Sequence, residues 1–218
     1  MITSMTNSYY MEITEIIEKR VIAQDTMMFL CSTDGEHKLE KEYLYNFMSR
    51  QVDGVIIIDP SRENHDNGIF KEVAKKMPLV LVHSFAGFYG FNSVSIDQHL
   101  GMSRVMEYLW TEGHRNIAFL RGFRGFSYDI KENCWRNFLS EKGIKPGEEN
   151  LIVISDGNTE AAIPLVQEAC SKVLMKEKRP SAIFACNDLM ALAVISAANM
   201  CGIKVPEELT VIGHDNTA

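Results

Sequence analysis

The strongest constraint on the fold is a repeated alternation of short apolar runs with amphipathic stretches. Several of the apolar runs contain almost no polar residue, which is typical of parallel strands covered on both faces. Strand followed by helix, repeated about seven times, predicts a doubly wound α/β architecture. The strand candidates are residues 26–31, 54–58, 79–83, 93–96, 116–120, 151–154, 182–186 and 209–213.

Apolar residues recur at helical spacing between these runs. Each such stripe predicts a helix that places one apolar face against a sheet. The stripes consist of Tyr9, Ile13, Ile16, Ile17 and Val21; of Leu39, Tyr43 and Phe47; of Ile130, Cys134 and Phe138; and of Ile163, Val166, Cys170, Val173 and Leu174. Three glycines follow helical patterns and are predicted to end the helices as C-caps. They are Gly113, Gly143 and Gly202.

Both ends of the sequence predict incomplete structure. Residues 1–3 can form only the stub of a strand before a helical pattern begins, and the chain stops a few residues after the strand candidate 209–213. We therefore interpret the sequence as a fragment of a longer protein.

The composition and the cysteine pattern indicate the cellular compartment of the chain and the kinds of partner it can bind. Twenty-two Lys and Arg against 29 Asp and Glu give a net charge of -7, and such an acidic surface repels phosphate backbones. The sequence has no apolar stretch of bilayer-spanning length and no signal-peptide pattern, so no membrane partner is expected. Five scattered cysteines indicate free thiols in a reducing compartment, and the predicted location is the cytoplasm. They are Cys31, Cys134, Cys170, Cys186 and Cys201.

Sequence motifs for catalysis are absent. No two glycines are separated by a single residue, which excludes the dinucleotide fingerprint, and there is no phosphate loop. The segment 125–129 resembles a nucleophile elbow but lacks the second glycine that the sharp turn requires. The six histidines show no metal-ligand spacing. The sequence therefore predicts no catalytic residue, no metal and no cofactor.

Polar and aromatic residues follow nearly every strand candidate. In open parallel sheets, ligands bind beyond the carboxyl ends of the strands. Carboxylates and amides can bond hydroxyl groups or ring nitrogens, and tyrosine rings offer flat apolar faces, so this set predicts a site for a small polar ligand. Its members are Ser4, Asn7, Tyr9, Tyr10, Thr33, Asp34, Asp59, His83, Ser84, Asp97, Arg121, Arg124, Asp156, Asn187, Asp188, His214 and Asp215.

A structural interpretation competes at several of these positions. Asn, Asp and Ser are the preferred helix N-caps, and Asp34 and Asp59 suit ordinary turns. The convergence of so many polar groups at one edge favours the ligand interpretation for the set as a whole. The candidates for N-caps are Ser8, Asp97, Asn187 and Asp188.

Six motifs in order along the chain resemble the lactose-repressor/galactose-repressor (LacI/GalR) family of transcription regulators. They lie at 4–10, 52–57, 94–97 with Gly101, 113–119, 182–191 and 202–216. The resemblance implies a type I periplasmic-binding-protein-like fold, with two doubly wound parallel-sheet lobes and the ligand cleft between them. It further implies an incomplete N-terminal lobe over 1–113, a C-terminal lobe over 114–218, and a homodimer. Operator DNA would be bound only by a helix-turn-helix headpiece that is missing from this chain.

The resemblance also implies roles for individual residues. Asp97, Asn187 and Asp215 match the polar effector contacts of the family, and Ser4 and Tyr10 match positions on the N-terminal lobe's side of the site. The adjacent Tyr9 is a further candidate for ligand contact. Lys131 stands where the family usually has an arginine, which weakens the case for a bidentate clamp. Other departures, which put the identity of the effector in doubt, are His83, Ser84, Gln98, Gly157 and His214.

The expected function is that of an effector-sensing and dimerisation domain of a bacterial repressor, in which a sugar-like or purine-like ligand allosterically controls operator binding. The alternative is a solute-binding protein of a sugar transporter, which shares the fold but does not suit five free cysteines and the missing signal peptide. A hydrolase or transferase has only the fold class in its favour.

Overall fold

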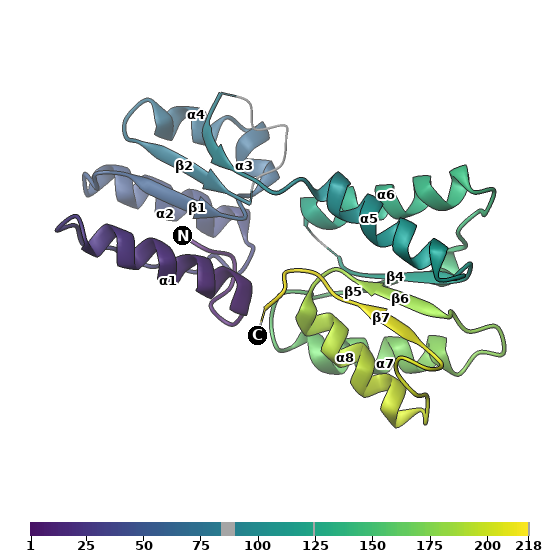
Figure 1. Ribbon diagram of the computed structural model, residues 1–218. Helices are drawn as coiled ribbons and strands as arrows, with labels where there is room; N and C mark the ends of the chain where they lie inside the picture. The colour runs from purple at the N-terminus through teal and green to yellow at the C-terminus, as the bar shows by residue number, and fades with distance from the viewer. Residues whose placement is uncertain (84–89, 124, 218) are drawn as a thin grey trace. The chain divides into compact units, whose positions relative to one another are not determined.

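The computed structural model describes residues 1–83, 90–123 and 125–217. The predicted residues Ser84 and Arg124 lie outside the described residues. The chain forms two compact units, Met1–Ile96 and Asp97–Ala218, each built on its own parallel sheet (Figure 1). The prediction of a doubly wound α/β chain with two parallel sheets is confirmed.

The sheet of the first unit contains β1 (Val55–Ile58), β2 (Leu79–Val82) and β3 (Asn92–Val94), in that order. All pairs are parallel, with Val55 opposite Leu79. Apolar residues from the sheet and its helices, such as Phe70 and Val73, are fully buried in a shared core. The helices of this unit are α1 (Ser8–Ile22), α2 (His37–Ser49), α3 (Arg62–Asp66) and α4 (Ile69–Ala74).

The second unit has a four-stranded parallel sheet in the order β5-β4-β6-β7. Its core is dense because aromatic rings pack in its centre, where Phe119 stacks on Trp135 and on Phe184, with ring centroids 5.5 Å apart in both pairs. The strands are β4 (Ile117–Gly122), β5 (Leu151–Ile154), β6 (Ala182–Ala185) and β7 (Thr210–Ile212). The helices are α5 (Gln98–Thr111), α6 (Phe126–Glu141), α7 (Ala162–Leu174) and α8 (Asp188–Met200), with a 3-10 turn, η1 (Glu148–Asn150).

The glycines predicted to end helices do so. Gly113, Gly143 and Gly202 follow the ends of α5, α6 and α8 and have φ angles of 90°, 80° and 71°. A side chain would be strained in this left-handed region. Both the positions of these helix ends and their residue type are therefore confirmed.

Two helices turn a slightly different face to the core than their sequence stripes predict. In α2 the buried residues are Glu40 and Leu44, whereas Leu39, Tyr43 and Phe47 are only partly buried. The same shift occurs in α6, whose fully covered positions follow the predicted stripe by one residue. The buried face of a helix is more than 100° wide. It therefore includes neighbouring polar residues when their charged groups are hydrogen-bonded, as Glu40 and Lys131 are. The buried residues of α6 are Tyr128, Lys131, Trp135 and Leu139.

The strand predicted at 26–31 does not form as a regular strand. The segment is extended, but its pairing is limited to one isolated parallel bridge between Ser32 and Ile2 just after it. A strand requires a ladder of backbone hydrogen bonds along its length, and among the described residues only Ile2 bonds to the backbone at the end of this segment, at Cys31 and Thr33. The sequence pattern of a strand is present, but its partner is too short.

The division into compact units places α5 with the second unit, whereas the predicted lobe boundary at residue 113 places it with the first. The units are defined by packing, whereas the predicted boundary marks the point where the chain passes from one lobe to the other. A helix can pack against the second lobe although it precedes the first strand of that lobe. The lobe limits 1–113 and 114–218 therefore stay predictions. Among the described residues, no helix is both long and apolar enough to cross a bilayer.

Glu40 is the one acidic residue in the described core of the first unit. Its Oε1 accepts a hydrogen bond from Asn64 Nδ2 at 2.8 Å, and its Oε2 accepts one from the Ser61 backbone N–H at 3.1 Å. Burial nevertheless raises the pKa of Glu40 to about 7 from its ordinary 4.5, because removing an ionised carboxylate from water outweighs these two bonds.

This pKa predicts that Glu40 makes the first unit less stable as the pH rises. A carboxyl whose pKa is raised in the fold stabilises fully below its unfolded pKa, and that contribution is lost as the pH rises through about 7. The shift corresponds to a free energy on the order of 3 kcal/mol. We expect the melting temperature of Glu40→Gln, relative to the unchanged chain, to rise between pH 5 and pH 8. Parallel pH profiles for the two chains would contradict this, and Glu42→Gln on the exposed face of α2 is the control.

Candidate functional site

Three non-glycine residues at the ends of the first unit's extended segments have positive φ angles. Asp34, Asp59 and His83 have φ values of 50°, 58° and 56°. Such residues are uncommon, and they cluster at ligand-binding and catalytic sites. Asp59 and His83 directly follow β1 and β2, and Asp34 follows the isolated bridge at Ser32, so this edge of the sheet is the candidate site of the first unit.

An aromatic cluster lies at the same edge. Tyr9 and Tyr10, at the start of α1, have ring centroids 5.7 Å apart, and the ring of His83 lies 5.5 Å from Tyr9 and 6.4 Å from Tyr10. The Tyr10 hydroxyl donates a hydrogen bond of 2.9 Å to Asp59 Oδ2. The cluster therefore combines flat apolar ring surfaces with a carboxylate held in fixed orientation, as sites for ring-shaped polar ligands do.

The structure gives Ser4 a local role. Its side chain is buried, and its hydroxyl accepts a hydrogen bond from the Thr6 backbone N–H at 3.2 Å and lies 3.0 Å from Thr6 Oγ1. Asn7 then caps α1 by accepting from the Tyr10 N–H. These contacts shape the turn that presents Tyr9 and Tyr10. The predicted cap at Ser8 is wrong by one position, because the Asn7 side chain reaches the N–H groups of the first turn.

In the second unit, Asn187 joins two elements. Its Oδ1 accepts from the Met190 N–H at 2.8 Å and so caps α8, and its Nδ2 donates to the Gly157 carbonyl at 2.7 Å. The structure confirms the capping role that competed with ligand contact for this buried residue. Asp188, the other proposed cap here, is the first residue of α8 and instead accepts from the Thr217 N–H at 2.8 Å.

Lys131 is only 2% exposed, although it carries an ammonium group. Its Nζ donates a hydrogen bond of 3.0 Å to the Cys186 carbonyl, at the carboxyl end of β6. Burial raises the pKa of the Cys186 thiol to about 12, and the charges of Lys131 and Arg121 oppose that shift while Asp215 adds to it. Cationic and anionic groups therefore surround the end of β6.

Asp215 follows β7 in a strained backbone. Its φ angle is 99° and that of Asn216 is 56°, and its Oδ1 lies 2.8 Å from His214 Nδ1. Two consecutive left-handed residues other than glycine are costly. As in the first unit, strain and a carboxylate occur together a short distance after a strand.

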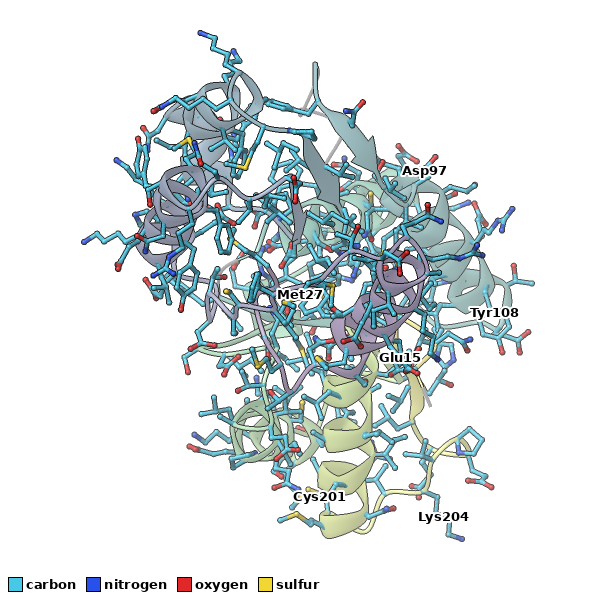
Figure 2. The ribbon with its side chains drawn as sticks, turned by 90° about the vertical axis from the view of Figure 1, so that its left-hand side faces the viewer. Glu15, Met27, Asp97, Tyr108, Cys201 and Lys204 are labelled. Atoms are coloured by element: carbon cyan, nitrogen blue, oxygen red, sulfur yellow. The ribbon has the colours of Figure 1, made fainter. Side chains whose placement is uncertain are left out.

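The remaining predicted residues serve other contacts. Asp97 caps α5 by accepting from the Leu100 N–H at 2.9 Å, and its side chain lies exposed at the start of that helix (Figure 2). Arg121 is bound to Asp129 and Glu132, at 2.6 Å each. Within the described residues no group of His, Cys, Asp and Glu could hold a metal ion.

Asp59 and His83 belong to the strand-end set predicted from the sequence, but the family resemblance does not imply an effector contact for either of them. Both directly follow a strand, so the strand-end rule identifies them as candidates, but only the fold shows that they contact Tyr9 and Tyr10. Of the residues predicted to contact the effector, six lie in two groups, one in each unit. They are Ser4, Tyr9 and Tyr10 in the first unit, and Lys131, Asn187 and Asp215 around β6 in the second.

Comparisons with solved structures agree with this architecture. A LacI family transcriptional regulator from Lactobacillus casei with bound sucrose matches 99% of this chain and 78% of its own, with a TM-score of 0.86 at 19% identity. The transcription regulator CcpA of Lactococcus lactis matches 99% of this chain and 77% of its own, with a TM-score of 0.82 at 23% identity. These likenesses establish the fold.

Sequence comparisons give relatives of higher identity and a match to a protein family. The HTH-type transcriptional regulator DegA of Bacillus subtilis (strain 168) is 33% identical over 98% of this chain, and catabolite control protein A of Priestia megaterium is 31% identical over 99%. The chain spans 62% and 64% of the lengths of these two relatives. The pattern of the family described as "Periplasmic binding protein-like domain" matches residues 106–218, slightly more than half of the chain. The chain therefore belongs to the family of periplasmic-binding-protein-like domains.

Proposed function

We propose that this chain is the effector-sensing and dimerisation part of a bacterial transcription repressor. The observation that carries the proposal is the alignment of regulators along nearly the whole chain, which includes the HTH-type transcriptional repressor PurR of Vibrio cholerae at 26% identity over 99% of it. The relatives are transcriptional regulators, and we propose no catalytic activity. Contact with operator DNA is assigned to a headpiece outside these 218 residues, because an acidic domain repels phosphates.

The chemistry of the strand ends supports a small, ring-shaped, polar effector. The rings of Tyr9, Tyr10 and His83 offer flat surfaces, and the carboxylates of Asp59 and Asp215 can accept hydrogen bonds from hydroxyl or N–H groups. Sugars and purines both combine a ring with such donors. The Lactobacillus casei regulator, which has the same fold, was solved with bound sucrose and with bound glucose, so sugars are the first class to test.

The proposed contact residues fall into groups according to the hydrogen bonds that their side chains already make within the protein. Asp215 and Tyr10 are proposed to touch the effector. The side chains of three other residues already cap a helix or stabilise a turn: Asn187, Asp97 and Ser4. We propose that they orient the site as well as bind the effector. Tyr9 would supply a ring surface, and Lys131 would place a positive charge near the end of β6.

Regulation requires that the effector distinguish two conformations of the protein. A ligand that binds both equally shifts nothing, and useful coupling is roughly 1–3 kcal/mol. In a dimer, the favoured conformation would set how two headpieces meet the two operator half-sites. The proposed location, the bacterial cytoplasm, follows from this role.

A thermal-shift screen against sugars, sugar phosphates and purines tests the proposal on the chain itself. A ligand at about a hundred times its dissociation constant stabilises the native state by about 2.7 kcal/mol. For a chain of this size we expect the melting temperature to rise by roughly 5–10 °C. A folded chain whose melting temperature responds to none of the three classes would contradict the proposed effector chemistry.

Asp215→Asn is expected to abolish the ligand-induced shift while leaving the melting temperature of the free chain nearly unchanged. Asparagine tolerates positive φ well and keeps the shape of the side chain, so the loss of charge is the main change. The exposed Asp53→Asn is the matched control. If Asp215→Asn shows the same ligand-induced shift as the unchanged chain, Asp215 does not contact the effector.

Tyr10→Phe is expected to weaken effector binding about fivefold, because it keeps the ring and removes the hydroxyl that orients Asp59. Calorimetric titration of the effector found in the screen measures the change. Tyr45→Phe removes a similar tyrosine–carboxylate bond of 3.0 Å, to Glu72 on the exposed surface, and should leave the affinity unchanged. Equal affinities for all three chains would show that the Tyr10 hydroxyl and its bond to Asp59 do not contribute to effector binding.

A further inference from the structure

A buried carboxylate, Glu40, is bonded to the loop that carries Asp59. Glu40 lies in the first turn of α2 and is only 2% exposed. It does not follow a strand, so the strand-end rule does not select it, and the proposed effector contacts do not include it. Its hydrogen bonds nevertheless lead to the candidate site of the first unit.

Two side chains join the start of α3 to the start of α2. Glu40 Oε2 accepts a hydrogen bond of 3.1 Å from the Ser61 N–H, and Glu40 Oε1 accepts one of 2.8 Å from Asn64 Nδ2. Asn64 is 1% exposed, and its Nδ2 also donates to the His37 carbonyl at 2.7 Å. Ser61 is the N-cap of α3. The Glu40–Asn64 pair therefore fixes where α3 begins relative to α2.

Asp59, two residues before Ser61, has a backbone that needs such support. Its φ is 58°, and a residue other than glycine keeps a positive φ only where surrounding contacts hold it. The next residue is Pro60, and the residue before a proline prefers an extended backbone. The Asp59 N–H donates to the Val82 carbonyl at 2.9 Å, which fixes the strand side of this turn. Glu40 fixes the other side through Ser61.

The charges of Glu40 and Asp59 also interact. Burial raises the pKa of Glu40 to about 7; the bonds from Asn64 and Ser61 oppose this shift, whereas the negative charge of Asp59 adds to it. Within the part of the chain that the structure describes, the other charged group that acts on Glu40 is the Met1 ammonium group, which lowers its pKa. Since the interaction is mutual, a ligand that donates hydrogen bonds to Asp59 and compensates its charge makes the ionisation of Glu40 easier.

Ionisation of Glu40 strengthens its bonds to the loop. An ionised carboxylate accepts on both oxygens, and such charge-assisted bonds are stronger than neutral ones. Protonation converts one oxygen into an O–H donor, which weakens the bond that this oxygen accepts from Ser61 or Asn64. The ionised form therefore supports Asp59 best, and it is also the form that a ligand bound to Asp59 favours.

We propose that Glu40 is a positioning residue of the effector site, whose ionised carboxylate holds the loop that fixes Asp59 in its binding conformation. This inference rests on the proposed function, in which Asp59 accepts hydrogen bonds from the effector. Glu40 itself is buried and acts through Ser61 and Asp59. Because binding at Asp59 favours ionised Glu40, effector affinity rises with pH through the neutral range.

NMR spectra of the free chain test the positioning without any effector. The backbone amide signals of Asp59 and Ser61 are expected to shift with a midpoint near pH 7, together with the signal of the Glu40 carboxyl carbon. Glu40→Gln removes the titrating group and should abolish this midpoint, whereas Glu42→Gln on the exposed face of α2 should keep it. Amide signals of Asp59 and Ser61 that titrate identically in Glu40→Gln and in the unchanged chain would overturn the proposal.

Calorimetric titration at pH 6 and at pH 8 measures the consequence for binding, with glucose, ribose 5-phosphate and hypoxanthine as probes of the three proposed ligand classes. The unchanged chain is expected to bind its probe about fivefold more tightly at pH 8 than at pH 6. Glu40→Gln is expected to weaken binding at pH 8 about fivefold and to flatten the profile, because the amide keeps one acceptor and meets the second donor with its own NH₂.

The difference between the two affinity profiles isolates Glu40, because the histidines and the Met1 ammonium group titrate in both chains. A merely structural Glu40 would give parallel profiles, and that result would overturn the proposal. If none of the three probes binds the unchanged chain at either pH, the proposed effector chemistry fails, while the NMR titration still decides whether Glu40 positions Asp59.

Discussion

The parallel direction of the strands is the constraint on which the candidate site depends. Because all strands of a sheet run the same way, their carboxyl ends meet at one edge. Tyr10 reaches Asp59 there in the first unit, and Lys131 reaches the Cys186 carbonyl in the second. The helices that join parallel strands cover the faces of the sheet. The edges are then the places where polar groups can gather without disturbing a core.

The two units have different side chains at the carboxyl ends of the strands of their own sheets. The first has left-handed residues at its strand ends and aromatic rings above them, with the tyrosines held by the capped start of α1. The second has a buried ammonium group, a bridging amide at Asn187 and a strained carboxylate at Asp215.

The helix α1 contributes both to the site and to an apolar cavity of the first unit. Its amino end carries Tyr9 and Tyr10, and its later turns line the cavity with Ile17 and Val21. A helix is a rigid element, so whatever fixes its apolar face also fixes the tyrosines at its start.

The sequence by itself determined the alternation of strands and helices, the glycines that end α5, α6 and α8, and the polar residues that follow the strands, because these features depend on neighbours along the chain. Its motifs also identified the family. Only the tertiary structure decided that Glu40 and Lys131 are buried, that 26–31 lacks a ladder, and that Asp59 and His83 belong with Tyr9 and Tyr10. Burial and pairing depend on segments distant in sequence, and a one-residue shift of a helix face changes which side chain the core must accommodate.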